Sequence, residues 1–350
     1  MNDKLSLIAQ SFGSLRVKRD EPMALHTNNK IGGTADLYVE TSTTSELVRV
    51  VRQCVELTLP FLVLGGATNV LVSDKGIRGV VIKNRAGSIN IVGMKGKMVA
   101  GKKEIGDVLL EAESGTPIGH LVRFTIEEEL AGLESFLGLP GTVGGAIYNN
   151  SHFQRHGKFI GDDIVQVKVQ NEKGDEVVLP KSELEFDYDF SRFHHTHEVI
   201  LSATFKLQKG DKAALWAKAQ EASQTIRLKE QPYDIPSHGC TFQNLTKQEA
   251  VSLERPNLNQ SAGALVDECG LKGACFGSAM ISDKHANFIV NKGGAKASEV
   301  LAIMQTIRHK VHEQFGVFLK PEIFLLGEWT DEERLSVGAP KRGKNGKTDH

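Results

Sequence analysis

Two glycine-rich segments, far apart in the sequence, contain the residue types that point most directly to chemistry. Residues 64–69 read Leu-Gly-Gly-Ala-Thr-Asn, and residues 138–145 read Gly-Leu-Pro-Gly-Thr-Val-Gly-Gly. Glycine tolerates positive φ and lets backbone N–H groups approach a ligand without a Cβ in the way. We therefore expect the two loops to hold a diphosphate between them. The predicted contact residues are Gly65, Gly66, Ala67, Thr68, Asn69, Gly141, Thr142 and Gly145.

Neither loop matches a common nucleotide-binding motif. No Gly-Lys-Ser/Thr follows either loop, as a Walker loop requires, and neither has the spacing Gly-x-Gly-x-x-Gly. For each loop taken alone, an ordinary glycine turn stays open as an alternative. The occurrence of two, with Thr and Asn side chains placed to hydrogen-bond, favours a bound cofactor.

A third segment, residues 237–244, places a thiol beside two amides in the sequence Ser-His-Gly-Cys-Thr-Phe-Gln-Asn. A loop thiol can donate a proton or act as a nucleophile, and amides can anchor a substrate. A plain turn into a helix is the structural alternative. No Cys-His-Asn signature surrounds Cys240, which disfavours a cysteine hydrolase. Glu322 follows a proline and directly precedes an apolar strand, so it is either a carboxylate facing a cleft or a surface acid.

The composition excludes several classes of protein. The chain has 350 residues, of which 40% are hydrophobic and 24% charged, and a formal net charge of -1. These values are ordinary for a globular protein and give no reason to expect a nucleic-acid partner. No apolar run approaches the length of a membrane span, and the first residues lack an apolar signal region.

The four cysteines form no Cys-x-x-Cys pair, which fits a reducing cytoplasm. Residues 194–197, His-His-Thr-His, lack companions at zinc spacing, so we expect no metal.

Alternating and helical patterns predict an α+β chain without a regular βαβ repeat. A Thr-Thr-Ser-Glu capping box precedes the first strong helix, and Thr-Pro begins the second. Strands are expected at residues 35–39, 61–64, 70–72, 108–114, 164–169, 176–179, 199–207, 288–290 and 323–326, and helices at 46–56, from 116 onward, and at 213–227, 261–269 and 298–315.

Taken together in their order along the chain, the motifs resemble those of the UDP-N-acetylenolpyruvoylglucosamine reductase family. The members of this family are flavoenzymes of peptidoglycan precursor synthesis. The resemblance covers about residues 26–329, nearly the whole chain apart from its ends. It rests on both glycine loops and the Cys240 segment. Further matching motifs are His-Thr at 26–27, Ile-Gly-Gly-Thr-Ala-Asp at 31–36, Glu-Phe-Asp-Tyr at 185–188, Gln-Pro at 231–232, residues 261–273, residues 284–291 and Pro-Glu-Ile at 321–323.

The resemblance implies a fold and a reaction. The fold is a vanillyl-alcohol-oxidase or PCMH-type FAD-binding region of two subdomains, followed by a C-terminal α+β substrate domain. The implied divisions are a leader at residues 1–27, the FAD-binding domain at 28–209, the substrate domain at 210–329 and a disordered tail at 330–350. NADPH would reduce FAD, and the reduced flavin would convert the enolpyruvyl ether of the UDP-sugar to UDP-N-acetylmuramate. We expect a cytoplasmic monomer without nucleic-acid or membrane partners.

The resemblance also assigns roles to single residues. Cys240 stands where the family usually has a serine that protonates the substrate carbon, and a thiol can fill that role. Glu322 matches the family's catalytic carboxylate. Substrate contacts are expected from Tyr188, Gln243 (where the family has lysine), Asn244 and His285.

Two departures stand out from the family pattern. The family follows its tyrosine with an arginine that stabilises an enolate-like intermediate, whereas this chain has Asp189. Arg192, three residues on, is the predicted substitute cation. The sequence of residues 149–163 also departs, with Asn-Ser-His-Phe where the family has Asn-Ala-Gly-Ala-Tyr-Gly. The alternatives to the reductase are a flavoprotein of the same fold with another substrate, or a catalytically impaired flavin- or UDP-sugar-binding protein.

Overall fold

The computed structural model describes residues 2–12, 16–99, 102–254 and 260–341, which divide into two compact units. Unit 1 consists of Met1–Lys18, Leu37–Gly66 and Val80–Lys229, and unit 2 consists of Arg19–Asp36, Ala67–Gly79 and Glu230–His350. The chain passes between the units several times, so no single cut near residue 210 separates them. The division expected from the sequence differs for this reason: a cut at one position cannot describe interleaved segments.

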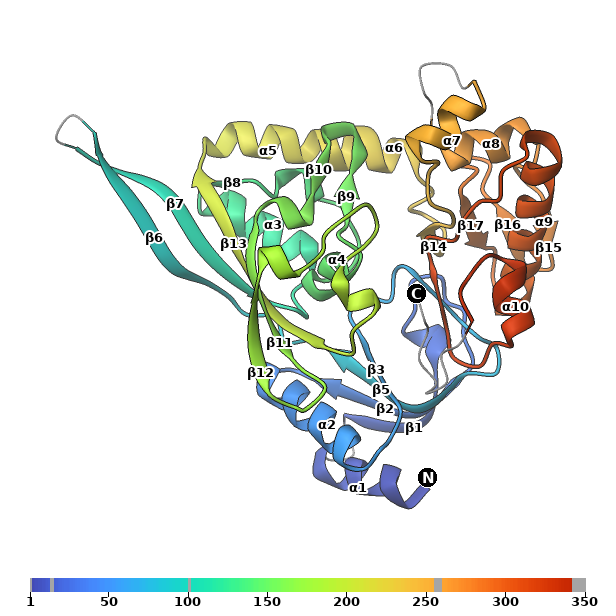
Figure 1. Cartoon of the computed structure of the whole chain (residues 1–350), viewed down its shortest axis with the longest axis horizontal. Helices are drawn as coiled ribbons and strands as arrows, with labels where there is room; N and C mark the ends of the chain where they lie inside the picture. The colour runs from blue at the N-terminus through green and yellow to red at the C-terminus, as the bar shows by residue number, and fades with distance from the viewer. Residues whose placement is uncertain (1, 13–15, 100–101, 255–259, 342–350) are drawn as a thin grey trace. The chain divides into compact units, whose positions relative to one another are not determined.

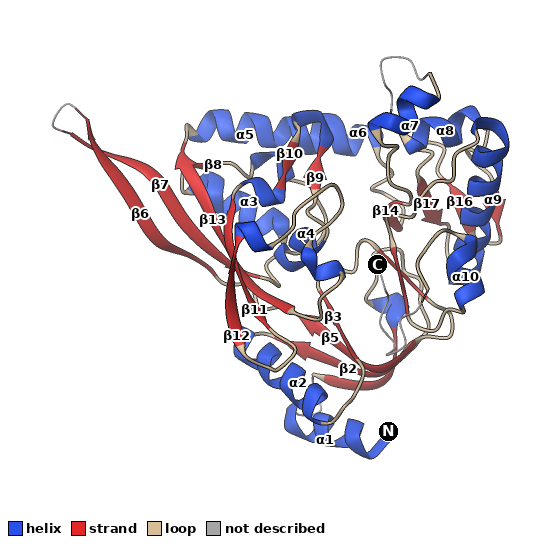
Figure 2. Ribbon diagram, in the orientation of Figure 1, coloured by secondary structure: helices blue, strands red, loops and turns tan. Residues whose placement is uncertain are grey.

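Unit 1 contains a large sheet whose strands run in the order β12-β11-β13-β7-β6, with neighbours antiparallel (Figure 1). Strands β6 and β7 form a hairpin that extends well beyond the other strands (Figure 2). Short β8 pairs with β13, and β9 pairs with β10. The strand bounds are β6 Ile89–Val99, β7 Lys102–Glu113, β8 Leu130–Ala131, β9 His152–Phe153, β10 Lys158–Phe159, β11 Ile164–Gln170, β12 Glu176–Pro180 and β13 Val199–Lys209.

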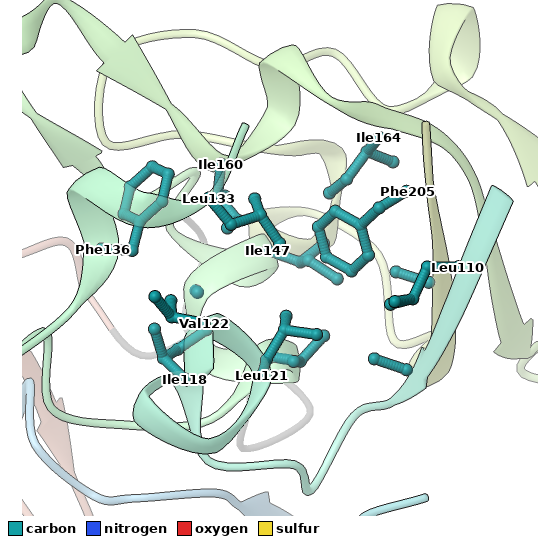
Figure 3. Close-up of a cluster of buried hydrophobic side chains, with 14 of the residues drawn as sticks. Leu110, Ile118, Leu121, Val122, Leu133, Phe136, Ile147, Ile160, Ile164 and Phe205 are labelled. Carbon is teal, nitrogen blue, oxygen red and sulfur yellow. The ribbon is translucent and has the colours of Figure 1, made fainter. Parts of the chain in front are cut away.

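Helices α3 (Ile118–Glu127) and α4 (Val143–Tyr148) pack their apolar faces against this sheet. Figure 3 shows Leu121 and Ile147 from these helices facing Leu110 and Phe205 from the strands. These four side chains are fully buried. Because α4 begins at Val143, within the second glycine-rich segment, this core fixes the position of that segment. Helix α5 (Lys212–Gln220) continues through a π-helical segment, Glu221–Arg227, into α6 (Leu228–Glu230).

A second sheet has the order β1-β2-β5-β3, with β3 parallel to β5. Its strands are β1 Val17–Pro22, β2 Thr34–Thr41, β3 Phe61–Leu64 and β5 Ile77–Asn84. In unit 1, α1 (Asn2–Phe12) and α2 (Thr44–Glu56) bury Leu5, Ile8 and Leu47 with residues of these strands. The Thr43 hydroxyl accepts from the Glu46 N–H at the start of α2, which is one of the two bonds of the predicted capping box, and the Glu46 carboxylate accepts from the Ser42 N–H at 2.8 Å.

Unit 2 contains a sheet of order β14-β17-β16-β15 and a parallel pair, β4 with β18. Helix α9 (Ala297–Phe315) supplies much of its core. The Asp74 carboxylate accepts from the first two amides of α9, at 2.7 and 3.0 Å, and so caps the helix. The remaining bounds are β4 Val70–Val72, β14 Ser237–Cys240, β15 Cys275–Phe276, β16 Ala279–Ile281, β17 Phe288–Asn291, β18 Phe324–Leu326, α7 Lys247–Ser252, α8 Ala262–Glu268 and α10 Asp331–Ser336.

The α+β class is confirmed, but both ends of the chain are more structured than the sequence predicts. The expected leader contains α1 and β1, and the expected disordered tail begins with α10, whose Arg334 is buried and donates to the Leu325 carbonyl at 3.2 Å. Packing against existing cores stabilises these short helices, and the local sequence pattern does not reveal that packing. Residues 342–350 of the expected tail and residues 255–259 lie outside the described residues.

Candidate active site

The two glycine loops meet inside unit 1. Gly65 follows β3, and a Cβ added there would collide with the Thr142 hydroxyl oxygen of the second loop. Thr142 is the N-cap residue of α4, yet its side chain makes no cap hydrogen bond. Its Oγ1 is buried and has no hydrogen-bond partner among the described residues. A buried hydroxyl without a partner is uncommon and marks a place where a ligand can supply one.

A half-buried lysine lies against the first loop. Lys83 Nζ donates a hydrogen bond to the Gly65 carbonyl. Burial, with Arg85 nearby, lowers the pKa of Lys83. Sequence reasoning missed this residue, although a lysine that ends the apolar run Val-Val-Ile of β5 was a usable signal. It brings a cationic side chain to the loop that is expected to hold a diphosphate.

The second loop has fewer available amides than its sequence suggests. The Val143 and Gly144 N–H groups donate to the Thr116 and Ser114 carbonyls, at 2.9 and 2.8 Å. A Cβ at Gly145 would lie 3.9 Å from the Thr142 hydroxyl, so this glycine is beside the unpartnered oxygen. The close approach at Gly65, the buried Thr142 hydroxyl and Lys83 together fit a diphosphate-bearing cofactor such as FAD.

Ala67, Thr68 and Asn69 of the first loop belong to unit 2. Ala67 adopts φ 51° and accepts from the Asn28 N–H through its carbonyl, at 3.1 Å. Asn69 Nδ2 donates to the Glu322 carbonyl at 3.0 Å, and the Phe324 N–H donates back to the Asn69 carbonyl. In unit 2, therefore, the end of this loop is tied to the strand that begins after Glu322.

Backbone pairing in unit 2 brings the Cys240 segment beside the Glu322 segment. The Glu322 N–H donates to the Thr241 carbonyl and the Gln243 N–H to the Lys320 carbonyl, both at 2.9 Å. Phe242 and Pro321 form an antiparallel bridge. Two residues far apart in sequence, a thiol and a carboxylate, thus lie on neighbouring extended segments, and both side chains are half-buried.

Asn244 and His285 each have a polar side-chain atom bound to the protein backbone. The Asn244 Oδ1 accepts from the Ala262 N–H at 3.0 Å, which directs the amide nitrogen elsewhere. The His285 Nδ1 accepts from the Asn287 N–H at 3.2 Å, which assigns the ring proton to Nε2. Burial lowers the pKa of His285, so the neutral ring presents an N–H donor. Both residues are suited to bind polar groups of a substrate.

His238, two residues before Cys240, is fully buried and offers a test by pH. Its Nε2 lies 3.0 Å from the Thr241 hydroxyl, and burial lowers its pKa to about 4. The unfolded chain has a histidine pKa of about 6.5. Between these values the unfolded state binds more protons, so stability is fully present above pH about 6.5 and falls as the pH drops toward 4. The expected loss is about 3 kcal/mol.

We therefore expect His238→Gln to melt with a weaker pH dependence than the unmodified protein. Between pH 7 and 4.5 the melting temperature of the unmodified protein should fall by about 5 to 10 °C more than that of the variant. Thermal melts at both pH values measure this difference. Equal falls in the two proteins would show that His238 does not stay neutral in the fold.

Tyr188 and Asp189 form the tip of a tight turn in unit 1. The Asp187 N–H donates to the Phe190 carbonyl at 3.1 Å, and the reverse bond is 3.3 Å. Asp189 has φ 49° and is buried, whereas Tyr188 is half-buried. The turn thus presents its tyrosine partly to solvent and its aspartate to the interior.

Arg192 is engaged by acidic partners. Its Nε and Nη2 donate to the two carboxylate oxygens of Glu198, at 3.1 and 3.2 Å, and its Nη1 donates to the Glu183 carbonyl at 3.1 Å. A two-point pair of this kind fixes the guanidinium and balances its charge. None of these contacts tests the predicted role of Arg192 as the substitute cation, but its pairing with Glu198 favours a structural role.

For Arg192→Ala, these contacts lead us to expect a structural effect. Loss of the pair should lower stability by about 2 kcal/mol and change turnover less than threefold. A thermal melt and steady-state kinetics on the same preparation test both. A hundredfold loss of turnover with an unchanged melting temperature would instead indicate that Arg192 acts as the substitute cation.

Within the described part of the chain, no three His, Cys, Asp or Glu residues gather to hold a metal ion. None of the described helices combines the length and the apolar sequence that a membrane span needs.

Comparisons with known proteins match both parts of the site. Residues 231–326 match the family described as UDP-N-acetylenolpyruvoylglucosamine reductase, C-terminal domain, and residues 35–179 match the family described as FAD binding domain. These matches confirm the predicted FAD-binding region.

Similar proteins align over most of their length. A UDP-N-acetylenolpyruvoylglucosamine reductase from Geobacillus thermodenitrificans is 37% identical over 316 residues, which cover 90% of this chain and 95% of that protein. One from Caldanaerobacter subterraneus is 35% identical, covering 88% and 93%. The crystal structure of the corresponding reductase from Thermus caldophilus aligns with a TM-score of 0.69 at 30% identity, covering 89% of this chain and 99% of that one.

Proposed function

The chain belongs to the UDP-N-acetylenolpyruvoylglucosamine reductase family, and we propose that it reduces the enolpyruvyl ether of UDP-N-acetylglucosamine enolpyruvate to the lactyl ether of UDP-N-acetylmuramate. The observation that carries this proposal is the pairing in unit 2 of the Cys240 and Glu322 segments. Reduction of a vinyl ether needs a hydride at one carbon and a proton at the other, and these segments supply an acidic hydrogen and a carboxylate.

We propose that FAD binds at the facing glycine loops of unit 1. Gly65 permits the close approach, the Thr142 hydroxyl has a hydrogen bond to offer, and Lys83 contributes positive charge near the first loop. When bound, FAD supplies a two-electron carrier that takes a hydride from a nicotinamide, here proposed to be NADPH, and passes it to the substrate.

Cys240 is proposed to donate its thiol proton to the carbon next to the substrate carboxylate. A thiol is more acidic than the serine hydroxyl usual in this family, so it can serve as the donor. Glu322 is proposed to polarise the enolpyruvyl group, and its position follows from backbone bonds to Thr241 and Asn69. Because both anchors are backbone or amide contacts, substitution of the carboxyl group alone leaves them in place.

The substrate is proposed to be held by the amide nitrogen of Asn244, the Nε2–H of His285, the amide of Gln243 and the hydroxyl of Tyr188. The structure commits the opposite polar atom of Asn244 and of His285 to neighbouring backbone. Each therefore offers donors in a fixed direction, which suits the carbonyl and phosphate oxygens of a UDP-sugar.

The test is product formation. The purified protein is incubated with NADPH and UDP-N-acetylglucosamine enolpyruvate, and we expect a product heavier by two hydrogen atoms together with stoichiometric NADPH oxidation. Flavin reduction without product would support one of the alternatives, a flavoprotein with another substrate or an impaired binding protein. Replacing NADPH by NADH in the same assay tests the nicotinamide preference.

We further propose that the protein works as a monomer in the cytoplasm, where nucleotide sugars are made. Light scattering after gel filtration is expected to give the mass of one chain, 38.2 kDa plus the flavin. A mass of twice that value would contradict the monomer.

A further inference from the structure

Lys320 lies directly opposite Gln243 in the two paired backbone segments of unit 2. The Gln243 N–H donates to the Lys320 carbonyl at 2.9 Å, and the neighbouring residues Phe242 and Pro321 form an antiparallel bridge. Residues that face each other across an antiparallel pair point to the same side, with Cβ atoms about 5 Å apart. The side chains of Gln243 and Lys320, the opposed pair, therefore leave the backbone as neighbours.

Burial of the surrounding side chains identifies the side to which the opposed pair points. Phe242, Leu319 and Ile323 are buried in the core of unit 2. Because side chains alternate along an extended segment, Lys320 and Glu322 point away from that core. The Lys320 side chain is exposed and the Glu322 side chain is half-buried. The lysine thus shares an accessible face with the carboxylate that is proposed to act on the enolpyruvyl group.

Bonds to the core of unit 2 hold both segments in this register. The Asn287 Nδ2 donates to the Phe242 carbonyl at 2.8 Å, and its Oδ1 accepts from the Phe242 N–H at 3.0 Å. The Arg308 Nε donates to the Leu319 carbonyl at 2.8 Å. None of these bonds involves the side chains of the opposed pair. The register is therefore expected to persist when either side chain is replaced.

The charge of Lys320 is not balanced by an acidic side chain among the described residues. Other lysines of unit 2 form close ion pairs: Lys272 with Asp267 at 2.7 Å, and Lys310 with Glu313 at 2.8 Å. Within the described part of the chain, Lys320 forms no such pair. Its ammonium is therefore available to an anionic ligand at this face.

This lysine compensates for a departure from the family pattern. At the position of Gln243 the family has a lysine, and the amide of glutamine carries no charge. Lys320 brings a cation to the neighbouring position from the opposite segment. A lysine ammonium is a compact charge on a flexible stem, which suits phosphate oxygens. The UDP group of the proposed substrate contains two phosphates.

We propose that Lys320 binds the diphosphate of the UDP-sugar and supplies the positive charge that Gln243 lacks. The exposed position of the lysine favours the diphosphate over the enolpyruvyl group, which is proposed to lie at Cys240 and Glu322. Lys320 is thus a substrate-binding residue without a part in hydride or proton transfer. The inference rests on the proposed function, because it concerns the same substrate.

The test compares two ligands of the oxidised holoprotein, UDP-N-acetylglucosamine and UDP-N-acetylglucosamine enolpyruvate. Both contain the diphosphate, and only the second contains a carboxylate. Lys320→Gln is expected to weaken the binding of both ligands about fivefold, whereas Lys320→Arg should bind both within twofold of the unmodified protein. The matched control is Lys310→Gln, which removes another exposed charge from unit 2 and should change neither affinity.

An exchange of the opposed side chains makes the test specific for their placement. The double variant Lys320→Gln with Gln243→Lys keeps the net charge and moves the lysine to the opposite segment. It should bind both ligands within twofold of the unmodified protein. The affinity of Lys320→Gln should also fall less steeply with added salt than that of the unmodified protein, because one charge interaction is missing.

Melting temperature and flavin content show whether each variant is folded. Since Lys320 and Lys310 have exposed side chains, the melting temperatures of their variants should stay within about 2 °C of the unmodified protein. Flavin content should be unchanged in every variant, because the residues proposed to hold FAD belong to unit 1. A change in affinity without a change in these two properties then reports on ligand binding.

Three results would overturn the inference and leave the proposed function standing. Binding of both ligands by Lys320→Gln within twofold would show that Lys320 does not contact the substrate. A loss confined to the enolpyruvyl ligand would assign the lysine to the carboxylate. A loss that the double variant does not recover would show that the opposed positions are not equivalent. If neither ligand binds the unmodified protein, the proposed function fails and the inference with it.

Discussion

Cys240→Ala is expected to slow the reoxidation of reduced flavin by the enolpyruvyl substrate about a thousandfold, in the range typical of a removed general acid. Reduction of the flavin by NADPH should stay within twofold, because that step needs no proton donor on the substrate. The substitution removes a half-buried side chain at the end of β14 and keeps the backbone bonds of Thr241 to Asn287 and Glu322. Anaerobic rapid mixing measures each half-reaction separately.

Cys240→Ser is the matched control for this prediction. A hydroxyl in the same place retains a proton to donate, and serine is the residue usual in the family, so at least a tenth of the reoxidation rate should remain. Equal losses in both half-reactions for Cys240→Ala would indicate damage to the fold or to flavin binding. Reoxidation of Cys240→Ala at the unmodified rate would remove Cys240 from the role of acid.

Gly65→Ala should yield a protein that retains little flavin. The new Cβ would collide with the Thr142 hydroxyl, so either the two loops separate or the threonine side chain turns into the space proposed for the diphosphate. Overpacking of this kind costs about 1–3 kcal/mol, which corresponds to flavin binding weaker by roughly 5- to 150-fold. The ratio of flavin to protein absorbance after gel filtration measures the effect.

Two further variants make this result specific. Gly119→Ala in α3 adds a Cβ that meets nothing within 4 Å, and it should retain full flavin. Adding Thr142→Ala to Gly65→Ala removes the colliding oxygen. The double variant should therefore regain part of the flavin content, even though the Thr142 hydroxyl itself is proposed to bind the diphosphate of FAD. Full flavin in Gly65→Ala alone would show that the diphosphate does not lie at the meeting of these loops.

Much of the fold was predictable where apolar spacing is strong. The expected helices at residues 46–56 and 298–315 correspond to α2 and α9, and the strands on either side of the first glycine loop correspond to β3 and β4. Helix α1 and strand β6 were not predicted. Helix α1 buries only Leu5 and Ile8 deeply, and β6 includes the exposed residues Val92 and Met94. Their stability comes from tertiary partners, which local pattern does not contain.

The residues of the site were easier to predict than their arrangement. Glycine, threonine and cysteine types identified the two loops and the Cys240 segment. The bridge between Phe242 and Pro321 joins segments that are distant in sequence, and no periodicity specifies it. The same holds for the placement of Lys320 opposite Gln243. The sequence shows that the lysine of the family pattern is missing at Gln243, and only the fold shows which lysine stands beside that position.

The most direct test of the account is substrate-driven reoxidation of the unmodified protein. The flavin is reduced anaerobically with one equivalent of NADPH and then mixed with UDP-N-acetylglucosamine enolpyruvate, and flavin absorbance is followed in time. We predict rapid and complete return of the oxidised flavin spectrum, with UDP-N-acetylmuramate formed in equal amount. A flavin that NADPH reduces but that stays reduced in the presence of this substrate would contradict the proposed function.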